Sequence, residues 1–158
     1  MNYCVCFLFT PDFEEVLLIK KNKTDFAGRL NGVGGKQNPH EYPHECALRE
    51  IKEETGCILQ PRRTAADGPD HTLMHLAQVK LHTDCAHSGD DCAVLDFWMS
   101  VVEKDEPSQQ PGETEHLVWM PVSKVLSTPT KNDLFAGDGD VQYMINLALR
   151  MFGTSKEA

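Results

Sequence analysis

Three glutamates near the middle of the chain have a spacing that could hold a metal ion. Glu50, Glu53 and Glu54 stand at positions i, i+3 and i+4, which places their side chains on one face of a helix within one turn. Three carboxylates so close together repel one another and destabilise a bare helix. A hard divalent cation reverses the sign of that interaction, because such ions prefer oxygen ligands. The spacing therefore predicts a helical site for a hard divalent cation.

The size and composition of the chain limit the fold in which this helix can sit. The chain has 158 residues, of which 41% are hydrophobic and 25% charged, as is typical of one globular domain with its own core. The longest uncharged apolar runs, such as residues 5–9, are too short to span a bilayer. The N-terminus has no basic segment before an apolar one, so it does not resemble a signal peptide. We therefore predict a cytoplasmic protein.

The charge of the chain restricts its partners. The net charge is −9, from 24 acidic and 15 basic residues, which disfavours non-specific binding to nucleic acid phosphates. We expect a small-molecule partner, no stable binding to DNA or RNA, no membrane association, and a monomer or homodimer. A polyphosphate ligand would need metal ions or a local basic patch to overcome the charge. The six cysteines, at positions 4, 6, 46, 57, 85 and 92, are expected to be reduced.

Hydrophobic patterning predicts strands mixed with helices in one domain, over residues 1–152. Residues 22–29 and 60–70 are expected as loops, and residues 153–158 as a frayed tail. The glycine-rich stretch of residues 30–35 allows the backbone to approach a ligand closely. Gly56 is expected to end the central helix in a left-handed conformation. The expected strands are 3–10, 14–20, 73–82, 93–102 and 118–122, and the expected helices are 43–55, 123–126 and 141–152. This mixture implies an α/β or α+β sandwich.

The residues around the glutamates extend the pattern in both directions. Five residues separate Gly35 from Glu41, seven separate Glu41 from Arg49, and Arg49-Glu-Ile-Lys-Glu-Glu-Thr-Gly-Cys follows. The pattern resembles the Nudix box, Gly-x5-Glu-x7-Arg-Glu-U-x-Glu-Glu-x-Gly-U, where U is a bulky apolar residue. All seven fixed letters match and Ile51 fits the first U, while Cys57 at the second is a mild departure. Such a match arises by chance about once in 10⁹ positions.

The resemblance implies a fold, a cofactor and roles for the box residues. The implied fold is a Nudix-type α/β/α sandwich with a mixed central sheet and a loop-helix-loop that carries the box. The implied cofactor is Mg²⁺, for which Mn²⁺ can substitute. Its implied ligands are Glu50, Glu53 and Glu54 together with the carbonyl of Gly34. Glu41 and Arg49 are expected to pair and to hold the loop against the helix.

Further residues outside the helix are candidates for the chemistry. Proteins similar to this one often place another metal ligand or a general base in the loop before the last strand. Glu115 and Glu113 both lie there, and Glu115 is favoured because it is nearer the strand; the alternative is a solvated loop acid. Lys36 follows the double glycine and either contacts phosphate or is an ordinary exposed lysine.

The segment Leu30-Asn-Gly-Val-Gly-Gly-Lys is similar to the one before the box in MutT-like nucleoside triphosphate pyrophosphohydrolases. By that resemblance Asn31 contacts the base. Asp138 and Asp140 are candidates for purine contacts, with helix caps or turns as the alternative. Aromatic residues can stack on a base or pack in the core; the candidates are Phe135, Trp98 and Trp119.

The expected activity is hydrolysis of a pyrophosphate bond in a nucleoside diphosphate-linked substrate. A (d)NTP that gives (d)NMP and pyrophosphate is favoured, with modified nucleotides among the candidates, because sequence marks of other Nudix subfamilies are absent. One alternative is an enzyme for ADP-ribose or another nucleotide conjugate. Another, from a different class, is a non-catalytic nucleotide-binding Nudix module.

One cluster lies outside the resemblance. His82, Cys85, His87 and Cys92 supply four potential soft-metal ligands within eleven residues. Their spacing matches no familiar zinc knuckle, so a loop between two strands is the favoured interpretation.

Overall fold

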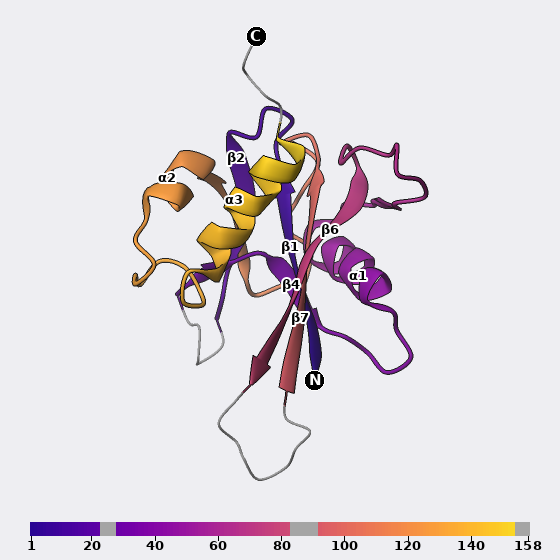
Figure 1. The fold of residues 1–158 in the computed structure, drawn as a ribbon, viewed down its shortest axis with the longest axis horizontal. Helices are drawn as coiled ribbons and strands as arrows, with labels where there is room; N and C mark the ends of the chain where they lie inside the picture. Colours follow the sequence, from indigo (N-terminus) through magenta and orange to yellow (C-terminus); the bar gives the residue numbers. More distant parts are fainter. Residues whose placement is uncertain (23–27, 83–91, 154–158) are drawn as a thin grey trace.

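The computed structural model describes residues 1–22, 28–82 and 92–153 of the chain. Within these ranges a mixed eight-stranded sheet forms the centre of the molecule, and helices cover both of its faces (Figure 1). The elements are β1 (Asn2–Phe9), β2 (Glu15–Lys20), β3 (Leu30–Asn31), β4 (Val33–Lys36), α1 (Pro43–Thr55), β5 (Gln60–Pro61), β6 (Thr72–His82), β7 (Cys92–Val101), β8 (His116–Pro121), α2 (Val122–Ser127) and α3 (Asp140–Phe152). The expected α/β/α sandwich is confirmed.

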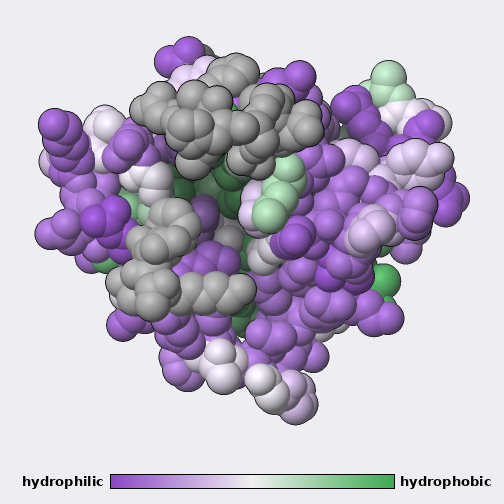
Figure 2. Space-filling model, turned by 90° about the horizontal axis from the view of Figure 1, so that it is seen from below, coloured by the Kyte–Doolittle hydropathy of each residue, from purple (hydrophilic) through white to green (hydrophobic). Residues whose placement is uncertain are grey.

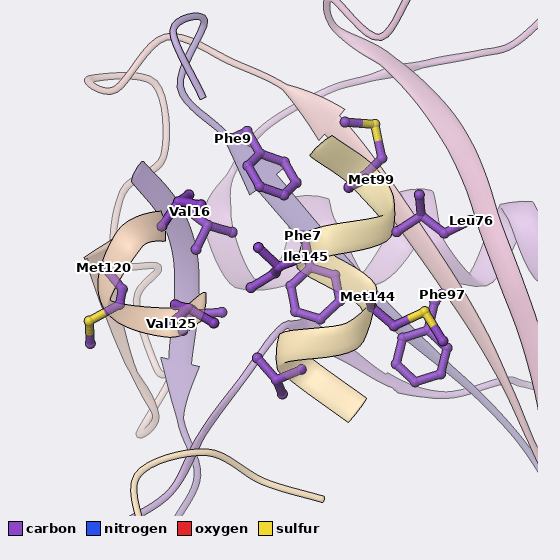
Figure 3. Packing of buried hydrophobic residues seen from close by; sticks show 14 of the residues in the cluster. Phe7, Phe9, Val16, Leu76, Phe97, Met99, Met120, Val125, Met144 and Ile145 are labelled. Atoms are coloured by element: carbon purple, nitrogen blue, oxygen red, sulfur yellow. The ribbon is translucent and has the colours of Figure 1, made fainter. Parts of the chain in front are cut away.

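Strand β1 lies in the middle of the sheet and is buried on both faces. Its residues alternate between two hydrophobic clusters, with Phe7 and Phe9 on the side of α2 and α3 and Cys6 and Leu8 on the side of α1. Figure 3 shows Phe7 and Phe9 close to Met144 and Ile145 of α3. Because helices cover both faces, β1 is an almost continuous apolar run.

The glycine-rich stretch forms the two short strands β3 and β4, which strand patterning did not predict. Strand β1 runs parallel to β7 on one side and, on the other, pairs with β4 through its first half and with β2 through its second half. Gly32 joins β3 to β4 at the point where β1 and β2 diverge. A side chain at Gly32 would lie 2.6 Å from the carbonyl oxygen of Cys6, so only glycine fits there. Pairing with β1 therefore fixes the backbone of Gly34 and Gly35.

Helix α1 has the bounds that its local signals predict. Pro43 occupies the first turn, and the carboxylate of Glu45 accepts a hydrogen bond from the Tyr42 N–H at 2.9 Å. Gly56 ends the helix with φ 78° and donates its N–H to the carbonyl of Lys52 at 2.9 Å. Cys46, Ala47 and Ile51 face the sheet and are fully buried.

Several boundaries of the strands and helices differ from expectation. Strand β5 lies inside the expected loop of residues 60–70, β8 begins two residues earlier than expected, and α3 begins one residue earlier. Of the His82 to Cys92 segment, residues 83–91 lie outside the described residues, and the backbone of His82 pairs with that of Cys92. In the described part of the chain, no helix has the length and apolarity needed to cross a membrane.

Candidate active site

Arg49 is the centre of an ionic network on α1. Its guanidinium binds both carboxylate oxygens of Glu41, through Nε at 2.7 Å and Nη2 at 3.0 Å. The contact expected between Glu41 and Arg49 is therefore present, in the forked geometry that only arginine provides. Arg49 Nη2 also donates to the carbonyl oxygen of Lys36 at 3.1 Å. These bonds tie the loop before the helix, and the end of β4, to α1.

The same arginine neutralises two of the helix glutamates. Arg49 Nη1 donates to Glu50 at 2.9 Å and to Glu53 at 3.3 Å. Hydrogen bonds from Arg49 hold the pKa of Glu41 below its ordinary value. In return, the hydrogen bond to Glu41 is the main cause that raises the pKa of Arg49. One cation thus balances three carboxylates.

Glu54 lies apart from this network, in the interior. It is only 6% exposed, and its Oε1 accepts a hydrogen bond from the Gly34 N–H at 3.2 Å. Its other oxygen, Oε2, is buried and has no hydrogen-bond partner among the described residues. Burial is the main cause that raises the pKa of Glu54 to about 8; the charge of Lys21 opposes the shift, and the nearby Glu50 carboxyl adds to it. The charged form of a buried carboxyl with an unpaired oxygen is stable only beside a positively charged partner.

The three helix glutamates do not converge as their spacing suggested. Glu50 and Glu54 face the protein, whereas the Glu53 side chain is 54% exposed and turns to Arg49. Among the residues that the structure describes, no three His, Cys, Asp or Glu side chains gather around a common point. The physical reason is that Arg49 attracts Glu50 and Glu53, while the Gly34 N–H holds Glu54. Glu53 is exposed, so packing does not restrain its side chain.

The donor atoms at this site nevertheless fit a hard divalent cation. Glu50 and Glu54 offer oxygen ligands only, and the unpaired buried oxygen of Glu54 is one that a cation would satisfy. Gly35 leaves room for the Glu50 carboxylate, because a Cβ at position 35 would lie 2.5 Å from Glu50 Oε1. Glu50, Glu54 and the backbone of Gly34 are thus the residues that could hold the ion, with Glu53 on the same turn.

We expect Gly35→Ala to lower kcat by roughly 10²-fold without unfolding the protein, since misplacement of a catalytic group by about 1 Å has such effects. The three atoms nearest to the added methyl all belong to the flexible end of Glu50, which can move. Steady-state kinetics with thermal unfolding checks both parts. Gly68→Ala is the matched control, because nothing lies within 4 Å of a Cβ there. A Gly35→Ala enzyme as fast as this control would contradict the role of Gly35 in the placement of Glu50.

A second group of residues lies at the end of β2. The Glu115 carboxylate accepts a hydrogen bond from the Asn22 N–H at 2.8 Å and lies 3.9 Å from Lys21 Nζ. The charge of Lys21 also lowers the pKa of Glu54, so Lys21 is close enough to act on both acids. The pairing of β2 with β8 brings Glu115 here, whereas Glu113 is exposed. Of the two loop acids, Glu115 is therefore the one beside the site.

Lys21 is a site residue that sequence reasoning missed. The available signal was a pair of lysines, Lys20 and Lys21, at the end of a predicted strand in an acidic chain. We expect Lys21→Met to raise KM about 10-fold or more, because a charge-assisted contact to a phosphate would be lost. Lys20→Met is the matched control, since Lys20 is exposed at the end of β2. Equal KM values in the two variants would exclude a role for Lys21.

The structure brings together the two chain segments that carry Asn31 and Asp138. Leu30 exchanges backbone hydrogen bonds of 2.8 Å with Leu134 and Ala136, so Asn31 lies beside the segment that leads to Asp138. Asn31 is partly buried and its Oδ1 accepts the Gly32 N–H at 2.8 Å. Asp138 is exposed. These two side chains remain candidates for contacts to a base.

The other three candidates, Phe135, Asp140 and Lys36, differ in their exposure and in their contacts. Phe135 is fully buried in the cluster under α3, so its ring is not accessible to a base; the stacking role expected for Phe135 is wrong for this structure. Asp140 begins α3, and the alternative that it caps this helix is wrong because Gly139 is the N-cap residue; its contact to a purine stays a prediction. Asp140 instead places its charge in the first turn, where the helix dipole favours an acid. Lys36 is exposed, and only its carbonyl bonds to Arg49.

An apolar hollow provides a surface on which a base could lie. Seen from below, apolar surface lies within a depression that is otherwise hydrophilic (Figure 2). The lower ends of β6 and β7 in Figure 1 reach this side of the molecule. Ala77, Val79 and Leu95 pack against the cluster under α3 and remain partly exposed.

Comparison with known proteins agrees with this architecture. The family model for the NUDIX domain matches residues 2–138. The MutT protein of Methanosarcina mazei Go1 has a similar structure, with a TM-score of 0.63 and 20% identity over 92% of each chain. A MutT NUDIX hydrolase of Burkholderia pseudomallei gives a TM-score of 0.60 and 22% identity over 93% of this chain and 98% of that one.

A third similar structure is the NUDIX domain of Shewanella oneidensis NrtR, solved in complex with ADP ribose. Its TM-score is 0.66, with 19% identity over 96% of this chain and 87% of that chain. This chain spans 63% of the NrtR chain in another structure, which extends beyond the domain. At these identities the likeness concerns the fold. The family match over most of the chain, with the complete box on α1, shows that this protein belongs to the NUDIX domain family and is a Nudix hydrolase.

Proposed function

We propose that the protein hydrolyses a pyrophosphate bond in a nucleoside diphosphate-linked substrate. The reaction that its residues support best is conversion of a (d)NTP, modified nucleotides included, to (d)NMP and pyrophosphate. The observation that carries the proposal is the buried Glu54 carboxyl, which is held by the Gly34 N–H beside Glu50 and has one oxygen unpaired.

The residues divide the work as follows. Glu50, Glu53, Glu54 and the Gly34 carbonyl would hold Mg²⁺, which when bound supplies charge neutralisation and lowers the pKa of water. Lys21, and Lys36 if it turns inward, place positive charge where the phosphates lie. Glu115 is fixed by Asn22 and Lys21 and can accept a proton from the attacking water. Arg49 positions Glu50 and the loop and does not touch the substrate.

Two features of the structure support a nucleoside triphosphate as the substrate. Asn31 and the segment toward Asp138 lie side by side, which offers hydrogen-bonding groups to a base edge. The polyphosphate end would then reach the lysine and the glutamates. A conjugate such as ADP-ribose is the second candidate, because the NUDIX domain of S. oneidensis NrtR has been solved with ADP ribose.

The test is product analysis over a panel of (d)NTPs, oxidised (d)NTPs, ADP-ribose, NADH and diadenosine polyphosphates, each with Mg²⁺ and with EDTA. We expect Mg²⁺-dependent release of a nucleoside monophosphate. Reaction in H₂¹⁸O places the label on the phosphorus that water attacks. Release of pyrophosphate supports the triphosphate assignment, and release of ribose 5-phosphate from ADP-ribose replaces it with the conjugate. A folded protein that binds nucleotides without turnover would establish the non-catalytic module.

A further inference from the structure

A pocket separate from the candidate active site opens on the α1 side of the sheet. None of its lining residues belongs to that site. It has a volume of about 310 Å³, within the range of small-ligand sites. Elements far apart in the sequence contribute to it, namely the first turn of α1, the end of β5, and the strands β6 and β7. The lining residues are His44, Pro61, Arg62, Leu73, His75 and Trp98.

A β-bulge in β6 shapes one wall of this pocket. The register of β6 against β7 shifts between His75 and Ala77. In a regular strand His75 and Gln78 would point to opposite faces, but the extra residue places both on the face of Asp96. The Asp96 carboxylate lies 2.9 Å from His75 Nε2 and accepts a hydrogen bond from Gln78 Nε2 at 3.2 Å. Asp96 is itself only 4% exposed and is not among the residues that line the pocket.

Trp98 supplies an aromatic wall with an unused donor. Its neighbours Phe97 and Met99 face the cluster under α3, whereas Trp98 packs on the α1 side. The His75 ring meets the Trp98 ring edge-on, with 4.6 Å between centroids. The indole Nε1 is buried and has no acceptor within the described part of the chain. Because this N–H is buried, Trp98 contributes its ring to the pocket wall and not its donor.

The mouth of the pocket carries positive charge on a strongly acidic protein. The guanidinium of Arg62 is held by its own loop, through bonds to the carbonyls of Thr64 at 3.2 Å and Ala65 at 3.0 Å. Among the described residues no partner is found for its Nη1, which is therefore an oriented donor that lowers the entropic cost of binding an anion. The His44 imidazole adds a second donor from the first turn of α1.

We propose that this pocket is a second nucleotide site, which binds a nucleoside monophosphate. The base lies against the rings of Trp98 and His75, Leu73 and Pro61 cover its apolar surface, and the phosphate lies at Arg62 and His44. Neither an uncharged ring nor a free phosphate uses both halves of the pocket. The site is independent of the hydrolysis proposed above, because no residue is shared.

The test uses AMP with EDTA present, so that no divalent cation supports binding at the candidate active site. Trp98 is one of only two tryptophans in the chain, so Trp119→Phe makes its fluorescence a direct report. We expect AMP to quench Trp98, and calorimetry on the unmodified chain to find the same site. Arg62→Met and Trp98→Phe should each weaken AMP binding about 10-fold or more. Arg63→Met is the matched control, since Arg63 is exposed and does not line the pocket.

Two ligand controls and one variant complete the design. Adenosine and inorganic phosphate should each bind at least about 10-fold more weakly than AMP, because each occupies one half of the pocket. Lys21→Met should leave AMP quenching of Trp98 unchanged. The proposal is overturned if AMP neither quenches Trp98 nor binds in calorimetry, if Arg62→Met binds AMP like Arg63→Met, or if phosphate alone binds as well as AMP. None of these outcomes depends on catalysis, so the proposed hydrolysis stands or fails separately.

Discussion

Glu54→Gln should lower kcat by about 10²- to 10³-fold, the effect of removing one preorganised electrostatic group from an active site. Glutamine has the same shape, so its amide oxygen can still accept the Gly34 N–H. What is lost is the negative charge at the buried oxygen, on which cation binding depends. Glu53→Gln should also lower kcat strongly if Glu53 turns from Arg49 to the ion.

The measurement pairs steady-state kinetics in Mg²⁺ with thermal unfolding in EDTA. The melting temperature of Glu54→Gln should not fall, because a buried carboxyl is replaced by a neutral group of equal volume. Glu103→Gln is the matched control, an exposed acid outside the site. Near-wild-type rates in both Glu53→Gln and Glu54→Gln would refute the assignment of the helix glutamates as ligands.

Arg49→Met should lower the free energy of unfolding by about 3 kcal/mol, because it leaves nearby carboxylates in a half-buried place without their cation. The side chains of Glu41 and Glu50 are only 12% and 13% exposed. For a domain of this size the melting temperature should fall by roughly 6–12 °C. Arg49→Lys should recover little of the loss, since a single ammonium cannot bind both oxygens of Glu41 and also reach Glu50.

A double-mutant cycle separates the ion pair from other effects of these changes. With Arg49→Met and Glu41→Gln as the single variants, chemical denaturation should give a coupling energy of at least about 1 kcal/mol, as for groups in direct contact. A coupling near zero would mean that Glu41 and Arg49 do not stabilise each other in solution. In that case the loop before α1 would need another anchor.

Local signals were sufficient where the structure depends on a few neighbouring residues. The bounds 43–55 expected for the central helix are those observed, because Pro43 and Gly56 act on the turns beside them. The contact between Glu41 and Arg49 could also be predicted, since both residues belong to the same sequence motif. The bulk of the sheet followed from strand patterning.

Long-range pairing decided what the patterning left open. Strand patterning predicted no strand in the glycine-rich stretch, yet it pairs with β1 and so holds Gly34 against Glu54. Phe135 seemed free to stack on a base, but its strand-like pairing with Leu30 places its ring in the core. Glycine content and aromatic character do not encode a pairing partner.

By itself the sequence determined the helix, its carboxylates and therefore the kind of chemistry, because the spacing of residues on one helical turn is set by the helix alone. Only the tertiary structure decided which glutamate is buried, since that depends on which face of α1 lies against β4. It also brought Lys21 and Glu115 together through the pairing of β2 with β8. Contacts between distant segments arise from sheet register and from packing of the two cores, and no local spacing specifies either.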